Sequence, residues 1–403
     1  MSERYFVRDT SRNLPAIASL TLDYDFFADG LPDVFDTLRG APGIQNLLTL
    51  SDIEELLTRR ALRRPAVRLI YDGRQLADSQ YVRDSSISPG AIDGSRVARV
   101  LHRGGTLVLQ GLQESVPRIG RLARGLQRDL GHPIHVNAYV TPPQSQGFGA
   151  HHDVQDSFIV QTVGTKTWYL HEPIIGKPFP HETADVFPSP TDFDSDAKEV
   201  TLNAGDVMWL PRGWIHYAKT ENDISVHLTI SADTLTRGWL LTQVVPRNLP
   251  AELREGVKDI FSSDDIRADE IEKLRSAALE WWQCAPNVLL EDLVVSAVRR
   301  RYSSPPRAPL AEFGDLADEY EVEPGVVYDI FSQVDNASVI RMIDCDVVVP
   351  NIEVAVLRQI LSSKLIRTSD IRKSVDDFSS ILRLLHEYGI ITPLLGGSDE
   401  IGL

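Results

Sequence analysis

The stretch from Gly149 to Pro173, GAHHDVQDSFIVQTVGTKTWYLHEP, places metal-binding residue types beside strand-like segments. Alternate side chains of a β-strand point to opposite faces, so we expect His151 and Asp153 to share one face and His152 to point away. A chelating pair of this kind needs a third ligand from a neighbouring strand. The best candidate is His216, which follows a strand-like run and a turn in GDVMWLPRGWIHYAKT, residues 205–220.

Two histidines and one carboxylate are the ligand set of non-haem Fe(II) oxygenases, which leaves open positions for a cosubstrate and O2. A zinc hydrolase more often uses three histidines or an HExxH helix, and the sequence contains no HExxH motif. An HxD pair with a distant histidine also arises by chance. The segments around the pair therefore have to support the metal hypothesis.

Two flanking segments have one polar face each. In VNAYV (136–140) this face holds Asn137 and Tyr139, and in SVHLTIS (225–231) it holds His227, Thr229 and Ser231. Such faces line a ligand cavity if the strands close into a barrel, and the alternative is a solvated outer surface. Lys166 is either a solvent-exposed turn residue or a cation that points into the barrel and pairs with a dicarboxylate.

The hydrophobic pattern divides the chain into three parts. Residues 1 to about 130 alternate helical and strand-like runs, and 136–231 is a series of short strands separated by Pro and Gly, which favours a sandwich or barrel. Two amphipathic helices follow, DDIRADEIEKLRSAALEWWQ (264–283) and NVLLEDLVVSAVRRR (287–301), and then a Pro/Ser-rich linker, 302–309. The tail reads as a helix over 351–361, a helix over 376–388 and a final strand, which suggests a winged helix.

The sequence thus predicts an α+β chain with a catalytic barrel over 1–240, a helical region over 241–305 and a winged-helix-like domain over 306–403. Trp281 and Trp282 lie about 100° apart on their helix, so this helix has more apolar surface than one neighbour covers. We therefore expect a homodimer through these helices. The alternative is that both tryptophans simply belong to a core.

Charge and composition limit the possible partners. The net charge is −16, and residues 310–403 carry 7 Lys or Arg against 17 Asp or Glu, so we expect no direct DNA binding, whereas a basic partner remains possible. The sequence has no apolar run of membrane-spanning length, and charged residues at the N-terminus argue against a signal peptide, which favours the cytoplasm. Cys284 and Cys345 lack the spacing of a disulfide framework or a zinc site, so we expect both to be buried apolar residues.

These motifs together resemble the JmjC-type 2-oxoglutarate oxygenases, and more narrowly their ribosomal oxygenase branch in the cupin-like superfamily. The resemblance covers residues 136–173, GDVMWLPRGWIHYA (205–218) and HLTIS (227–231), and it extends to the helical region and the winged helix. It implies a double-stranded β-helix barrel in which His151, Asp153 and His216 bind Fe(II). It further implies that Lys166 and Thr229 hold 2-oxoglutarate, and that Asn137, Tyr139 and Ser231 contact the substrate. His152 departs from the family, which usually has an aromatic residue there.

The resemblance implies an enzyme that uses Fe(II), 2-oxoglutarate and O2 to hydroxylate the β-carbon of a histidine or arginine in a protein such as a ribosomal protein. The same chemistry could act on a biosynthetic peptide or small molecule, and histone demethylation is a further possibility at the family level. A different class of function is a non-enzymatic DNA-binding regulator with the barrel as its ligand sensor, which the charge of residues 310–403 argues against.

Overall fold

The computed structural model describes residues 14–59, 62–83, 89–179, 181–182, 197–244, 264–285, 287–302, 307–311, 313–333, 337–372 and 377–394. Contacts within the chain divide it into two compact units. One consists of residues 1–234, 305–340 and 348–403, and the other of residues 235–304 and 341–347. Residues 303–306 of the Pro/Ser-rich linker lie outside the described residues, and the domain boundaries at 240 and 305 stay predictions.

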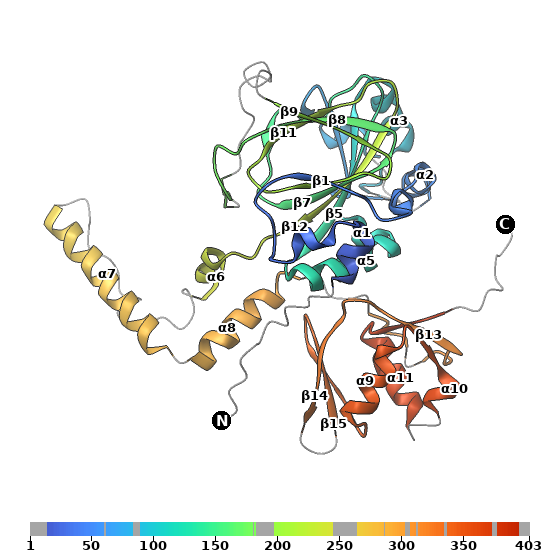
Figure 1. Cartoon of the computed structure of the whole chain (residues 1–403), viewed down its shortest axis with the longest axis vertical. Helices are drawn as coiled ribbons and strands as arrows, with labels where there is room; N and C mark the ends of the chain where they lie inside the picture. The colour runs from blue at the N-terminus through green and yellow to red at the C-terminus, as the bar shows by residue number, and fades with distance from the viewer. Residues whose placement is uncertain are drawn as a thin grey trace. The chain divides into compact units, whose positions relative to one another are not determined.

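Eight strands form a barrel whose interior contains the candidate site (Figure 1). They are β5 (Ile134–Thr141), β6 (His151–His152), β7 (Asp156–Val163), β8 (Thr165–His171), β9 (Lys198–Asn203), β10 (Val207–Leu210), β11 (Ile215–Lys219) and β12 (Ser225–Ala232). In one sheet the order is β10-β7-β12-β5, and in the other it is β6-β11-β8-β9. The chain thus passes repeatedly between two antiparallel sheets, which is the double-stranded β-helix that the sequence predicted.

The larger sheet is extended at both edges by the N-terminal segment. Strand β1 (Asp36–Leu38) pairs with β10 at one edge, and β4 (Thr106–Leu109), β2 (Val67–Tyr71) and β3 (Arg74–Gln75) continue from β5 at the other. Helices cover the outer face of this sheet, with α1 (Pro15–Leu20) and α5 (Pro117–Leu130) beside β5 in Figure 1. The remaining N-terminal elements are α2 (Leu50–Thr58), α3 (Gly94–His102), α4 (Leu112–Ser115) and the 3-10 turns η1 (Tyr24–Phe27), η2 (Ile44–Leu47) and η3 (Asp78–Gln80).

The main hydrophobic core lies between these helices and the larger sheet. On β5 the alternate residues Val136, Ala138 and Val140 belong to this core, and β12 contributes Val226, Leu228 and Ile230. The other faces of β5 and β12 therefore point into the barrel, where His227, Thr229 and Ser231 are buried. The expectation that these polar faces line an interior is confirmed, and the solvated outer surface is wrong.

The C-terminal part contains two three-stranded sheets and three short helices. The elements are β13 (Glu319–Val322), β14 (Val327–Gln333), β15 (Ala337–Met342), β16 (Asp346–Val349), α9 (Val354–Ser362), β17 (Leu365–Arg367), α10 (Thr368–Ile371), α11 (Phe378–Glu387) and β18 (Ile391–Pro393). Helices α9 and α11 and strand β18 match the segments that the sequence predicted. The strands β13 to β17, and β9 in the barrel, have no counterpart among the segments that the sequence predicted. The winged-helix assignment stays a prediction.

The second unit contains α6 (Arg237–Val244), α7 (Asp264–Cys284) and α8 (Asn287–Arg299). The two longer helices lie where the amphipathic pattern predicted them. Trp281 is buried, but Trp282 is 48% exposed and Leu274 is 60% exposed, so part of the apolar surface of α7 is uncovered in the single chain. The prediction that both cysteines are buried is wrong, because Cys284 at the end of α7 is exposed and Cys345 is half-buried.

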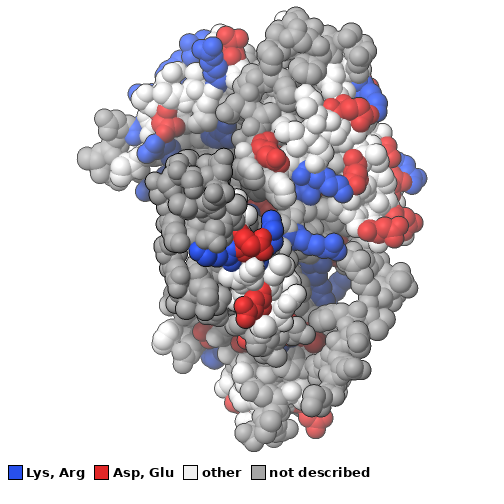
Figure 2. All heavy atoms as spheres, turned by 90° about the vertical axis from the view of Figure 1, so that its left-hand side faces the viewer, with Lys and Arg blue, Asp and Glu red and all other residues white. Residues whose placement is uncertain are grey.

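One face of the molecule shows how the charged side chains are distributed. On the face shown in Figure 2, Lys and Arg side chains lie next to Asp and Glu side chains instead of gathering into one basic patch among the described residues. Within the described ranges, no helix combines the length and the apolar character needed to cross a bilayer.

Candidate metal centre and anion pocket

Strand pairing places the two candidate histidine ligands side by side. In the β6–β11 ladder His151 lies directly opposite His216. Asp153 follows β6 instead of lying within it, because the strand ends at His152. Its main-chain carbonyl accepts a hydrogen bond of 2.9 Å from the Gly213 N–H in the turn before β11, which holds this segment beside the second histidine.

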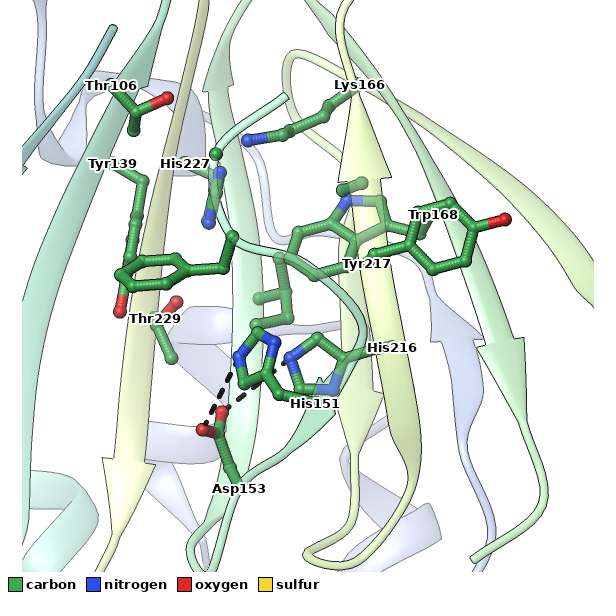
Figure 3. A pocket seen from close by; sticks show the side chains of 14 residues that line it. Thr106, Tyr139, His151, Asp153, Lys166, Trp168, His216, Tyr217, His227 and Thr229 are labelled. Carbon is green, nitrogen blue, oxygen red and sulfur yellow. Dashed lines mark ion pairs between the residues drawn. The ribbon is translucent and has the colours of Figure 1, made fainter. Parts of the chain in front are cut away.

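The three side chains converge on one point inside the barrel (Figure 3). The His151 Nε2 atom lies 3.9 Å from Asp153 Oδ1, and the His216 Nε2 atom lies 3.8 Å from Asp153 Oδ2. One ligand atom of each residue lies within 4.8 Å of the others. Metal–ligand bonds of about 2.0–2.2 Å place ligand atoms at comparable separations, so the three residues fit a metal ion with little movement.

Backbone contacts fix which nitrogen of each histidine faces the centre. His151 Nδ1 lies 2.8 Å from the Gly149 carbonyl, and His216 Nδ1 lies 3.0 Å from the Trp214 carbonyl. A ring that donates from Nδ1 to a carbonyl presents a lone pair at Nε2, which is the form that binds a metal. Burial, followed by the neighbouring His151 ring, lowers the pKa of His216 to about 4, so this imidazole is neutral at neutral pH.

His152 takes no part in this centre. Its side chain is buried on the other face, where Nε2 lies 2.9 Å from the Glu182 carbonyl. The prediction that His151 and His152 point to opposite faces is therefore confirmed.

Lys166 lies inside the barrel and has no acidic partner among the described residues. The side chain is 4% exposed, and its Nζ donates a hydrogen bond of 3.0 Å to Thr141 Oγ1, which also contacts Thr106 Oγ1 at 3.2 Å. Burial lowers the pKa of Lys166 to about 7. The solvent-exposed alternative is wrong. A buried ammonium group without a counter-charge is costly, so this position favours an anionic ligand.

A glycine turn sets the position of this lysine. Gly164 connects β7 in one sheet to β8 in the other and has a φ of +64°. A Cβ atom at this position would lie 2.0 Å from the Ile224 carbonyl oxygen. Only glycine therefore allows this tight crossing, which begins β8 one residue before Lys166.

One pocket joins the metal centre to Lys166. Of the predicted residues, Tyr139, Lys166 and Thr229 line it together with His151, Asp153 and His216. Asn137 and Ser231 are not among the lining residues: Asn137 Oδ1 accepts a hydrogen bond from the Gly111 N–H, and Ser231 Oγ lies 2.9 Å from Ser157 Oγ. Their proposed contact with substrate stays a prediction.

Several lining residues received no role from the sequence. They are Thr106, Phe148, Trp168 and His227, with Thr141 behind Lys166. Strand alternation gives a signal for two of them, because Trp168 shares a face with Lys166 and His227 shares a face with Thr229. Thr106 and Phe148 come from β4 and from the loop before β6, for which alternation along a barrel strand gives no signal.

Comparisons with known proteins agree with this architecture. Residues 112–238 match the family model of the JmjC domain. Ribosomal oxygenase 1 of Homo sapiens is 28% identical over 223 residues, which are 53% of this chain and 33% of that protein. The bifunctional lysine-specific demethylase and histidyl-hydroxylase NO66 of Drosophila persimilis is 29% identical over 181 residues, 44% of this chain and 26% of that protein. The matched region therefore spans a third or less of the length of each of these two relatives.

Solved structures share the fold along nearly the whole chain. The X-ray structure of Escherichia coli ycfD has a TM-score of 0.56 at 15% identity and covers 93% of this chain and 98% of its own. A second structure of this E. coli ribosomal oxygenase, in complex with cobalt and 2-oxoglutarate, has a TM-score of 0.53 at 15% identity and covers 93% and 99% of the two chains. Residues 112–238 are therefore similar to the JmjC domain, and the chain shares its fold with the E. coli ribosomal oxygenase.

Proposed function

We propose that the chain is an Fe(II)- and 2-oxoglutarate-dependent oxygenase that hydroxylates a side chain of a protein substrate. The observation that carries this proposal is one pocket in which two histidine Nε2 atoms and a carboxylate converge beside a buried lysine that has no acidic partner in the part of the chain that the structure describes. The names of the relatives, and the cobalt and 2-oxoglutarate bound by the E. coli neighbour, support the same chemistry.

Each residue has a distinct task in this mechanism. His151, Asp153 and His216 would hold Fe(II) on one side and leave the other coordination positions open. When bound, the metal with 2-oxoglutarate and O2 supplies the oxidation that converts a C–H bond into an alcohol and yields succinate and CO2. Lys166 would pair with one carboxylate of 2-oxoglutarate, and Thr229 would assist from β12. This carboxylate would serve as the counter-charge of the buried Lys166 ammonium group, and the charge-assisted hydrogen bond between them would orient the cosubstrate.

The exposure of the ligands indicates where a substrate enters. The Asp153 side chain is half-buried, whereas those of His216 and Lys166 are buried. The substrate therefore approaches from the side of Asp153, and the cosubstrate occupies the end near Lys166. Tyr139, which lines this pocket, is the residue that we expect to face the substrate, and Asn137, on the same face of β5, and Ser231 are further candidates.

The proposed substrate is a basic protein or peptide, with the β-carbon of a histidine or arginine as the target. The net charge of −16 would steer such a partner toward the enzyme. A biosynthetic peptide or small molecule, or a methylated lysine of a histone, would use the same metal centre. We further propose a cytoplasmic homodimer in which residues 241–305 provide the interface and residues 306–403 form a winged helix that serves assembly and not DNA binding.

The test has two parts. Purified protein with Fe(II), 2-oxoglutarate and O2 should produce succinate, and its Mn(II) form should bind 2-oxoglutarate in calorimetry. Mass spectrometry of proteins from a deletion strain and its parent should then find a protein that lacks the mass of one oxygen atom in the deletion strain. Failure of the Mn(II)-loaded protein to bind 2-oxoglutarate would contradict the proposed function, whichever substrate is offered.

A further inference from the structure

His227 is a pocket residue whose orientation is fixed on two sides. It lies on β12 directly opposite Tyr139 of β5, and the two rings stack with centroids 4.9 Å apart and planes 4° apart. The Trp168 ring meets the His227 ring edge-on at 5.1 Å. The pairing of β12 with β7 is irregular between Val226 and His227, and such irregularities redirect a side chain within a sheet. The imidazole is thus held in one orientation within the barrel (Figure 3).

The Nδ1 atom of His227 is not used by the protein fold. The residue is 3% exposed, and its buried Nδ1 has no hydrogen-bond partner among the described residues. A buried polar atom left without a partner costs about 1–3 kcal/mol, so such an atom inside a ligand pocket points to a ligand. Burial, followed by the charge of Lys166, lowers the pKa of His227, and the ring is therefore neutral.

Two simpler roles do not account for this arrangement. His227 is not part of the cluster of possible metal ligands, which consists of His151, Asp153 and His216 within the described residues. If residue 227 only filled the core, phenylalanine would serve equally well, because it stacks on tyrosine without leaving a polar atom unpaired. The nitrogen therefore needs an explanation that involves the content of the pocket.

We infer that His227 is a positioning residue for the cosubstrate, whose imidazole N–H donates a hydrogen bond to an oxygen atom of bound 2-oxoglutarate beside Lys166. This inference rests on the proposed function. Lys166 contributes charge through a flexible side chain, whereas the neutral His227 ring, fixed by Tyr139 and Trp168, contributes a hydrogen bond in one direction without adding a second positive charge. Together they would set both the affinity and the orientation of 2-oxoglutarate.

The test compares three substitutions in the full-length Mn(II)-loaded protein. His227→Phe keeps the ring that stacks on Tyr139 but removes both nitrogen atoms, His227→Leu removes the ring as well, and His227→Asn keeps an N–H near the position of Nδ1. Calorimetry measures the affinity for Mn(II) and, separately, for 2-oxoglutarate. Replacing His102, an exposed histidine on α3, with Phe is the matched control.

We expect His227→Phe and His227→Leu to weaken 2-oxoglutarate binding by about 10- to 100-fold, because each variant loses a hydrogen bond to a charged group. Mn(II) affinity should stay within about twofold, because the metal ligands are unchanged, and His227→Asn should recover most of the 2-oxoglutarate affinity. Wild-type affinity in His227→Phe, or equal losses in His227→Phe and His227→Asn, would overturn the inference and leave the proposed function standing. A wild-type protein that binds Mn(II) but not 2-oxoglutarate would overturn both.

Discussion

His216 is the most buried of the three proposed metal ligands, and its Nδ1 is already engaged by the Trp214 carbonyl. His216→Ala removes the Nε2 atom that faces Asp153, so we expect Mn(II) affinity to fall by about tenfold or more and succinate formation to be lost. Calorimetry with Mn(II) and an assay of succinate measure the two effects. The control is His102→Ala on the exposed side of α3, which should behave as wild type. Unchanged metal affinity in His216→Ala would refute the ligand assignment.

Lys166 is a residue at which binding and stability should change in opposite directions. Lys166→Met replaces a buried cation, for which the described ranges contain no acidic partner, with an apolar side chain of similar length. We expect 2-oxoglutarate binding to be lost, because the carboxylate has no charged partner, while thermal stability at pH 7 rises. Lys166→Arg should keep part of the affinity. Calorimetry and thermal unfolding test both effects, and a Lys166→Met protein that binds 2-oxoglutarate as wild type does would show that another group holds the carboxylate.

The pKa of Lys166 also predicts how the stability of the protein and its affinity for 2-oxoglutarate depend on pH. Its folded value of about 7 lies below the ordinary lysine value of 10.5, so the unfolded chain binds more protons than the folded one between these values. Stability from this group therefore rises with pH from about 7 to 10.5. Binding of the anionic cosubstrate needs the protonated lysine, and the affinity for 2-oxoglutarate should fall as the pH rises above 7. The pH dependence should be absent in Lys166→Arg, because arginine stays charged throughout this range.

At the scale of single elements, most of the barrel strands and the opposite orientation of His151 and His152 could be predicted, because both follow from strand alternation. His151 and His216 belong to strands whose neighbours in sequence already show which face is buried. The two-residue strand β6 and the irregular pairing near His227 could not be predicted, because they depend on contacts between distant strands. Strand β9 alternates weakly and is largely exposed, so its sequence, KEVTLN, gives little hydrophobic signal.

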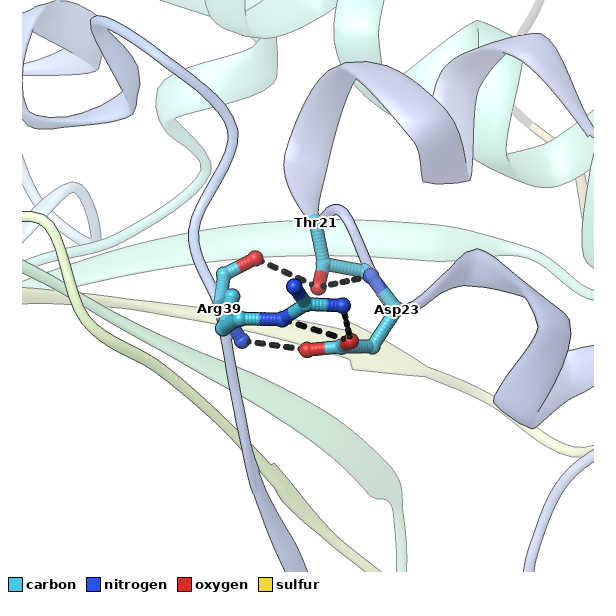
Figure 4. A network of polar contacts seen from close by, with 3 residues as sticks. All are labelled: Thr21, Asp23 and Arg39. Atoms are coloured by element: carbon cyan, nitrogen blue, oxygen red, sulfur yellow. Dashed lines mark hydrogen bonds and ion pairs between the residues drawn. The ribbon is translucent and has the colours of Figure 1, made fainter.

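The turn after α1 and the end of β1 are joined by a network of three residues (Figure 4). Thr21 Oγ1 donates to the Arg39 carbonyl at 2.8 Å, and the Arg39 N–H and Nε donate to the Asp23 carboxylate at 2.6 and 2.9 Å. The same carboxylate forms an ion pair with Arg39 Nη2. The network holds the segment that leads into β1, which forms the edge of the larger barrel sheet beside β10.

Hydrogen bonds from the Arg39 side chain and then from its backbone lower the pKa of Asp23 below 3.8. A carboxyl group with a lowered folded pKa contributes stability above its unfolded value and loses it as the pH falls through the folded value. Asp23→Asn should therefore be less stable than wild type at pH 7, and the difference should shrink below pH 3.8. Chemical denaturation at pH 7 and at pH 3 measures this, with Asp25→Asn in η1 as the neighbouring control. A difference between wild type and Asp23→Asn that is the same at both pH values would contradict the network's role.

On the scale of the whole molecule, charge argues against nucleic acid as a partner of the C-terminal part. Residues 310–403 have a net charge of −10, and each phosphate contact made by a protein depends on Lys or Arg. We expect the full-length protein to show no retention of duplex DNA in a mobility shift at 150 mM salt, a concentration of physiological order. Tight binding that persists as the salt concentration rises would contradict this expectation and favour the regulator hypothesis.

The uncovered apolar surface of α7 leads to the last prediction, a homodimer. Ile271, Leu274 and Trp282 are all about half exposed in the single chain, and Val295 of α8 is 48% exposed. Soluble proteins rarely leave such a surface in water, and a pair of identical helical hairpins can cover both copies at once.

Light scattering at micromolar concentration should give the mass of a dimer for wild type and of a monomer for the double variant Leu274→Glu, Trp282→Glu. Glu280→Lys, an equally large change of charge at an exposed polar position of α7, is the control and should remain dimeric. A monomeric wild-type protein would refute the dimer. A symmetric interface at this surface would bury two glutamates from each copy of the double variant without a partner of opposite charge, which is unfavourable. A double variant that stays dimeric would therefore show that the interface lies elsewhere on the chain.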